Sequence, residues 1–127
     1  MSTAYYWSLP PRAQAVADAR RTLRERCHHL PPPVLDDALL LTSELVTNAV
    51  RHGTGEIHCC LWTGPKVLRV EVSEAGSSFP MPVEAGPDAL SGRGLHIVST
   101  IAARWGAASD PSNHGKTVWF EIETGHE

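Results

Sequence analysis

Apolar side chains recur at helical spacing in three segments of the chain. In residues 34–52 the apolar positions fall on one arc when successive residues are placed about 100° apart. These positions are Leu35, Ala38, Leu39, Thr42, Val46, Ala49 and Val50, and the opposite side carries Asp37, Glu44, Asn48 and Arg51. Gly53 follows as a helix C-cap. Residues 12–28 and 94–104 predict two further helices. Their inward positions are Ala13, Val16, Ala17, Ala19, Arg20 and Leu23, and then Leu95, Val98 and Ile101.

A period of two in the side chains predicts the central strands. Residues 57–62 and 68–72 form a hairpin around a turn at 63–66, and residues 116–123 form a strong strand. Residues 5–9 predict a short edge strand, and residues 105–108 another short strand. The segment 75–92 has no period and is rich in Gly, Ser and Pro, and a loop this long is usually functional or mobile.

The predicted element order is β-α-α-β-β-α-β-β. Strands and helices mix without regular alternation, so the fold class is α+β. We expect a two-layer α/β sandwich whose mixed sheet is mostly antiparallel and carries its helices on one face. With 127 residues the chain is expected to form one domain over residues 1–127.

Composition narrows the function classes. A hydrophobic content of 42% and a charged content of 20% are typical of globular proteins. The net charge of -3 and the lack of a basic run argue against nucleic-acid binding. No apolar run approaches the roughly 20 residues of a membrane helix. The three cysteines, an odd number, argue against a disulfide framework, and the N-terminus lacks a signal-peptide pattern. We therefore expect a cytoplasmic protein.

Two groups of residues carry candidate chemistry. Glu44 and Asn48 lie one helical turn apart, so their side chains share a face. An amide oxygen suits Mg²⁺, and a neighbouring carboxylate can accept a proton. The alternative is an ordinary solvent-facing side of an amphipathic helix.

Gly92-Arg93-Gly94 opens the third predicted helix, where free backbone N–H groups favour anions. Its alternative is a flexible loop end with a solvated arginine. Thr117, near the start of the last strand, is either a ligand donor or an ordinary strand threonine.

In this order the segments resemble the GHKL, or histidine-kinase-like, ATPase superfamily with the Bergerat nucleotide-binding fold. The closest likeness is to its small anti-sigma factors that are also serine-protein kinases. Residues 41–53, with the sequence LTSELVTNAVRHG, resemble the first sequence motif, or box, of that branch. Residues 92–98, with the sequence GRGLHIV, resemble its glycine box. The resemblance implies ATP and Mg²⁺ as cofactors, with Glu44 as general base and Asn48 as the metal ligand. It implies a lid at residues 75–91. The nucleotide contacts it implies are Asn48, His52, Glu74, Gly76, Gly92, Arg93, Gly94, Leu95 and Thr117.

One box departs from the family pattern. Where the family has Asp-x-Gly-x-Gly, with the aspartate accepting a hydrogen bond from the adenine amino group, this chain has Glu74-Ala75-Gly76-Ser77-Ser78. Glutamate keeps the acceptor on a side chain one methylene longer. A strained or lost adenine hydrogen bond would cost about 1–3 kcal/mol.

The resemblance implies a switch protein that sequesters a sigma factor and phosphorylates a serine or threonine of an anti-sigma-factor antagonist. An alternative keeps the fold but drops phosphoryl transfer, leaving a module that inhibits its partner by docking. A third reading is an unrelated α/β scaffold. Nucleic acid and membrane are not expected as partners, and a homodimer is considered through residues 5–9 and the tryptophans.

Overall fold

The computed structural model describes residues 3–52, 55–75, 93–110 and 115–125. Along the chain the elements are β1 (Thr3–Leu9), α1 (Gln14–Arg26), α2 (Pro32–His52), β2 (Ile57–Thr63), β3 (Val67–Ala75), α4 (Arg93–Ile101), β4 (Arg104–Asp110) and β5 (Gly115–Glu123). This is the order of strands and helices that the sequence predicts.

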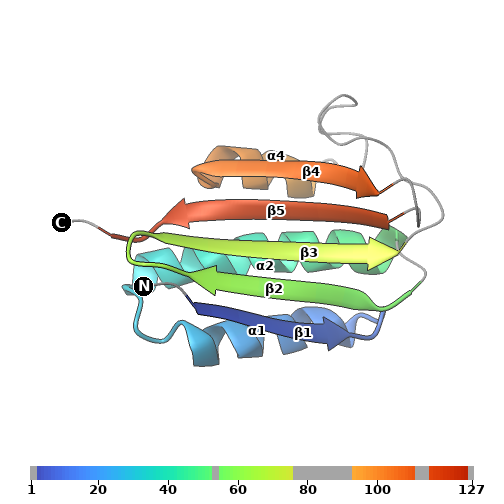
Figure 1. The fold of residues 1–127 in the computed structure, drawn as a ribbon, viewed down its shortest axis with the longest axis horizontal. Coiled ribbons are helices and arrows are strands. Elements are labelled where there is room, and N and C mark those ends of the chain that lie inside the picture. Colours follow the sequence, from blue (N-terminus) through green and yellow to red (C-terminus); the bar gives the residue numbers. More distant parts are fainter. Residues whose placement is uncertain (1–2, 53–54, 76–92, 111–114, 126–127) are drawn as a thin grey trace.

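The described strands form one sheet with the order β1-β2-β3-β5-β4. Each of its neighbouring pairs is antiparallel, so this part of the sheet is more regular than the mixed sheet expected. The helices cover a single face, as Figure 1 shows, and the predicted two-layer α+β architecture is confirmed. The strand at residues 5–9 does lie at the edge of the sheet, although β1 begins two residues earlier. None of the described helices is both long enough and apolar enough for a membrane span.

The core lies between the sheet and the helices because alternate residues of the central strands point to that side. Leu68, Val70 and Val72 of β3 are buried there, and so are Val118 and Phe120 of β5. The register places Val70 opposite Phe120 and Val72 opposite Val118. The central strands therefore offer the helices a continuous apolar surface.

Helix α1 buries part of the predicted stripe: Ala19 and Leu23 are buried as predicted, and Val16 packs against the core. Ala15, Ala19 and Leu23 are fully buried, whereas Ala13 and Ala17 are exposed. Alanines occupy both sides of this segment, so the apolar period alone did not separate Ala15 from Ala13 and Ala17. Arg20 is half-buried rather than apolar core, and its guanidinium donates to Ser43 Oγ at 2.8 Å and to Leu39 O at 3.3 Å. Arg20 therefore connects α1 to α2 through hydrogen bonds.

The helix boundaries also differ from prediction: α1 is shorter by two residues at each end, and α4 begins one residue earlier. Helix α2 begins at Pro32, not at residue 34, because prolines in a first turn lose no intrahelical hydrogen bond. Helix α4 ends at Ile101, not at residue 104, because the backbone then joins the sheet: Ala103 N donates to Glu121 O at 2.9 Å. Strand β4 follows from Arg104 and runs beyond the four residues expected.

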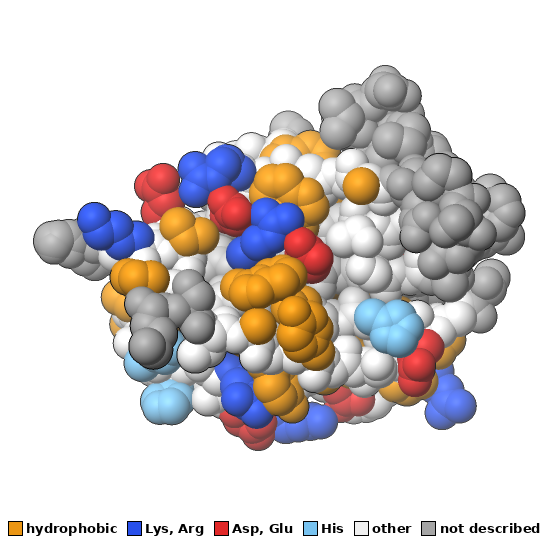
Figure 2. Space-filling model, viewed as in Figure 1, with side chains coloured by type: hydrophobic (Ala, Val, Ile, Leu, Met, Phe, Trp, Pro, Cys, Tyr) orange, Lys and Arg blue, Asp and Glu red, His pale blue; other side chains and the backbone are white. Residues whose placement is uncertain are grey.

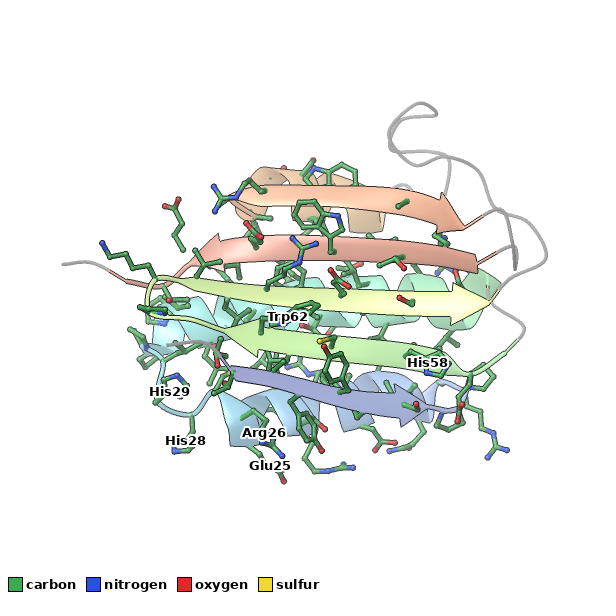
Figure 3. All side chains as sticks on the ribbon, in the orientation of Figure 1. Glu25, Arg26, His28, His29, His58 and Trp62 are labelled. Atoms are coloured by element: carbon green, nitrogen blue, oxygen red, sulfur yellow. The ribbon has the colours of Figure 1, made fainter. Side chains whose placement is uncertain are left out.

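The opposite face of the sheet carries no helix, and Figure 2 shows a band of apolar side chains there among charged ones. The Arg69 guanidinium lies 3.9 Å from the centre of the Trp119 ring and binds Glu71 at 2.8 Å and Glu121 at 2.9 Å. Trp62, labelled in Figure 3, packs edge-to-face with Tyr6 on the same side. Trp7 and Trp105, in contrast, pack against the core. The tryptophans therefore divide between the two faces.

Candidate functional site

Helix α2 brings Glu44 and Asn48 to the centre of the helical layer. It packs against α1 on one side, against α4 on the other, and against strands β3 and β5. Glu44 is half-buried, and Asn48 is only 2% exposed. The prediction that Asn48 lies on a polar outer face was therefore wrong. A helix with neighbours on three sides buries an arc wider than one apolar stripe.

The Asn48 amide has unmet hydrogen-bonding capacity. Neither its Nδ2 nor its Oδ1 has a hydrogen-bond partner among the described residues. Leaving a buried polar group unpaired costs about 1–3 kcal/mol, so such groups in native proteins call for an explanation. A neutral amide oxygen held in this way fits a hard cation such as Mg²⁺. The position of Asn48 thus suits the metal that the resemblance implies.

Two charged side chains meet at the end of the central strands. Glu74 and Lys116 are directly opposite each other on β3 and β5, and Lys116 Nζ lies 3.3 Å from Glu74 Oε2. Both side chains are almost completely buried, at 2% and 3% exposure. The pKa of Lys116 is lowered, chiefly because burial removes the ammonium from water, while the Glu74 carboxylate acts in the opposite direction.

Sequence reasoning missed Lys116. The signal available was the alternation of the last strand: Lys116 shares its side with Val118 and Phe120, which face the helices. The same alternation places Thr117 on the other side. Its hydroxyl lies 2.8 Å from Ser73 Oγ, on the face without helices. The structure therefore does not bring Thr117 together with Glu74, Glu44 or Asn48.

The glycine box coincides with the start of α4. The helix begins at Arg93, so Arg93, Gly94 and Leu95 form its first turn, whose N–H groups have no intrahelical partners. Val98, one turn further on, is fully buried and α4 packs against α2. Figure 1 shows the start of α4 at the same end of the molecule as the ends of α2 and β3.

Several predicted contacts fall outside what the structure describes. Gly76, Gly92 and most of the predicted lid lie outside the described residues. His52 is the last residue of α2, but its side chain and those of Arg93 and Leu95 are not described. Their roles stay predictions.

A groove of about 430 Å³ lies elsewhere, between α1 and α2. It is lined by Ala13, Val16, Thr47, Val50 and Arg51. None of Glu44, Asn48, Glu74 and Lys116 lines this groove, so the groove is separate from the candidate site. Within the described part of the chain, no three His, Cys, Asp or Glu side chains are grouped to hold a metal ion.

Comparison with known proteins identifies the class of protein. Residues 9–122 match the family model described as histidine kinase-like ATPase domain. This match spans most of the chain, so the protein belongs to the histidine kinase-like ATPase family, and the resemblance of its motifs is confirmed at that level.

One solved structure gives a more detailed likeness. The crystal structure of the RsbU and RsbW domains of Rv1364c from Mycobacterium tuberculosis matches with a TM-score of 0.72 at 18% sequence identity. The match covers 98% of this chain and 33% of that one, so the chain spans about a third of that protein's length. At this identity the likeness shows the fold alone. None of the curated proteins compared with the chain matches it.

Proposed function

We propose that the chain binds ATP with Mg²⁺ and transfers the γ-phosphoryl group to a serine or threonine of an anti-sigma-factor antagonist. In the same proposal it acts as an anti-sigma factor that sequesters a sigma factor in the cytoplasm until the antagonist releases it. Membership of the histidine kinase-like ATPase family supports the nucleotide, and the likeness to a structure that contains an RsbW domain supports the regulatory branch. The observation that carries the proposal is the buried, unpaired Asn48 amide one turn from Glu44.

The proposed roles follow from the positions of the side chains. Asn48 Oδ1 would hold Mg²⁺, which when bound supplies positive charge against the phosphates. Glu44, half-buried and one turn earlier on α2, would accept the proton of the attacking hydroxyl. The first turn of α4, with Gly92 before it, would bind phosphate oxygens through backbone N–H groups. Glu74 would accept a hydrogen bond from the adenine amino group. Phosphoryl transfer needs mostly positioning and charge neutralisation, which a small domain can provide.

A second candidate function is a binding module that inhibits its partner without phosphoryl transfer. The observation that favours it is that Glu74 and Ser78 stand where the family pattern has an aspartate and a glycine. A homodimer through the edge strand β1, where Tyr6 is 67% exposed, stays a prediction.

The experiment combines binding and transfer. Calorimetry with ATP and Mg²⁺ measures nucleotide binding, and incubation with labelled ATP and the cognate antagonist measures transfer. We expect saturable binding, and label on the antagonist with the wild-type protein but not with Glu44→Gln. Binding without transfer in either protein would select the binding module. No binding at millimolar ATP would refute the nucleotide site itself.

A further inference from the structure

The ion pair of Glu74 and Lys116 stands out from its surroundings. On the helix-facing side of β3 and β5, the next inward pair along the strands is Val72 with Val118, and then Val70 with Phe120. Only the last inward pair before the strand ends is charged. That end is where α2 terminates and α4 begins, as Figure 1 shows, and hence where the proposed nucleotide site lies.

Stability alone does not account for a buried pair at this position. Removing two charges from water opposes folding, and well-packed apolar residues often replace such pairs without loss of stability. The adjacent inward pair on the same two strands, Val72 with Val118, is apolar and buried. The charges are therefore better explained by what they bind or orient.

We infer that Lys116 is a positioning residue for nucleobase recognition, an inference that rests on the proposed function. Its ammonium, 3.3 Å from Glu74 Oε2, holds the Glu74 carboxylate in one orientation toward the 6-amino group of adenine. Glutamate is one methylene longer than the aspartate of the family pattern and has one more rotatable bond. The cross-strand lysine draws that longer side chain toward β5 and removes the extra freedom. The carboxylate then accepts a hydrogen bond from an amino group and finds no partner on a purine that lacks one.

The test compares two nucleotides in the presence of Mg²⁺: ATP, and purine riboside triphosphate, which lacks the 6-amino group. Calorimetry measures both affinities for the wild-type protein and for Lys116→Met, which keeps the length of the side chain without its charge. The matched control is Lys66→Met. Lys66 is the only other lysine of the chain, is exposed, and lies in the β2–β3 turn at the far end of the strands.

We expect the wild-type protein to prefer ATP by about 10-fold or more, as one hydrogen bond to a charged acceptor provides. In Lys116→Met the preference falls to about 1- to 2-fold, because affinity for ATP drops while affinity for purine riboside triphosphate is nearly unchanged. Lys66→Met keeps the wild-type preference. A merely structural lysine would lower both affinities together, so an equal loss overturns the inference.

Breaking a buried ion pair is strongly destabilising, so Lys116→Met is checked by circular dichroism. The reversed pair, Glu74→Lys with Lys116→Glu, keeps both charges and decides the question where Lys116→Met does not fold. We expect it to fold and to lose the preference for ATP, because an ammonium replaces the acceptor. A reversed pair that retains the wild-type preference contradicts the inference.

Different experimental results would refute the inference and the proposed function. A wild-type protein that binds neither nucleotide refutes both. A wild-type protein that binds ATP and purine riboside triphosphate equally well keeps the nucleotide site and overturns only the role of the ion pair.

Discussion

Replacing Asn48 with leucine should separate the stability of the protein from its function. Asn48 is 2% exposed, and neither polar atom of its amide has a partner among the described residues. An apolar side chain of similar shape removes a desolvation cost of about 1–3 kcal/mol. Leucine also favours a helix interior by up to about 0.7 kcal/mol. Against this, overpacking of the site opposes folding by about 1 kcal/mol.

The expected net effect is a nucleotide-free protein more stable by about 1–2 kcal/mol. For a chain of this size that corresponds to a rise in Tm of about 3–8 °C. The stabilisation that nucleotide gives to the protein should decrease in this variant. ATP with Mg²⁺ at 100 times its Kd stabilises a binding-competent protein by about 2.7 kcal/mol, and Asn48→Leu should lose most of this gain.

Differential scanning calorimetry with and without ATP and Mg²⁺ measures both effects. The matched control is Thr42→Val on the same helix. The Thr42 side chain is fully buried, and its hydroxyl also has no partner among the described residues. This control should gain stability and keep the full response to nucleotide. If Asn48→Leu melts below the wild-type protein without nucleotide, the reasoning from the unpaired amide is refuted.

Three further outcomes are expected. Glu44→Gln should keep its affinity for ATP within about 3-fold and lose phosphoryl transfer by about 10²- to 10⁴-fold, measured as labelled antagonist; undiminished transfer would exclude Glu44 as the base. Burial raises the pKa of the Cys27 thiol to about 11 and that of Cys59 to about 12, so both thiols should react with a disulfide reagent at pH 8 far more slowly in the native protein than in urea. Equal rates would show that these thiols are accessible. Gly106→Ala would bring a Cβ to 2.8 Å from the Trp119 ring, so urea titration should show a loss of about 1–3 kcal/mol, and an unchanged midpoint would mean that the ring moves aside freely.

The elements could be predicted from the sequence because their periods are strong. Strand β5 alternates Val118, Phe120 and Ile122 with polar or amphipathic neighbours, and the structure shows those three buried. Helix α1 was predicted only in part: Ala19 and Leu23 are buried as expected, but alanines on both sides of the helix blurred the limits of its apolar stripe. The burial of Ala15 instead of Ala13 and Ala17 follows from how α1 packs on α2, which no local pattern records.

The site was predictable only in part. The spacing of Glu44 and Asn48 correctly places them one turn apart, but the burial of Asn48 depends on how α2 packs among α1, α4 and the sheet, which lie elsewhere along the chain. The contact of Glu74 with Lys116 depends on the register between β3 and β5. A shift of one residue would put Thr117 in the place of Lys116, and sequence spacing does not fix that register.

The place of β5 in the sheet has a consequence for synthesis on the ribosome. β5 is the last of the described strands along the chain, yet it lies between β3 and β4 and contributes the fully buried Phe120. Until β5 emerges from the exit tunnel, the edge of β3 that pairs with β5 is unpaired, and β4 has no partner in the described sheet. The nascent polypeptide must therefore keep an aggregation-prone edge covered, by chaperones or by transient contacts, until the final strand inserts.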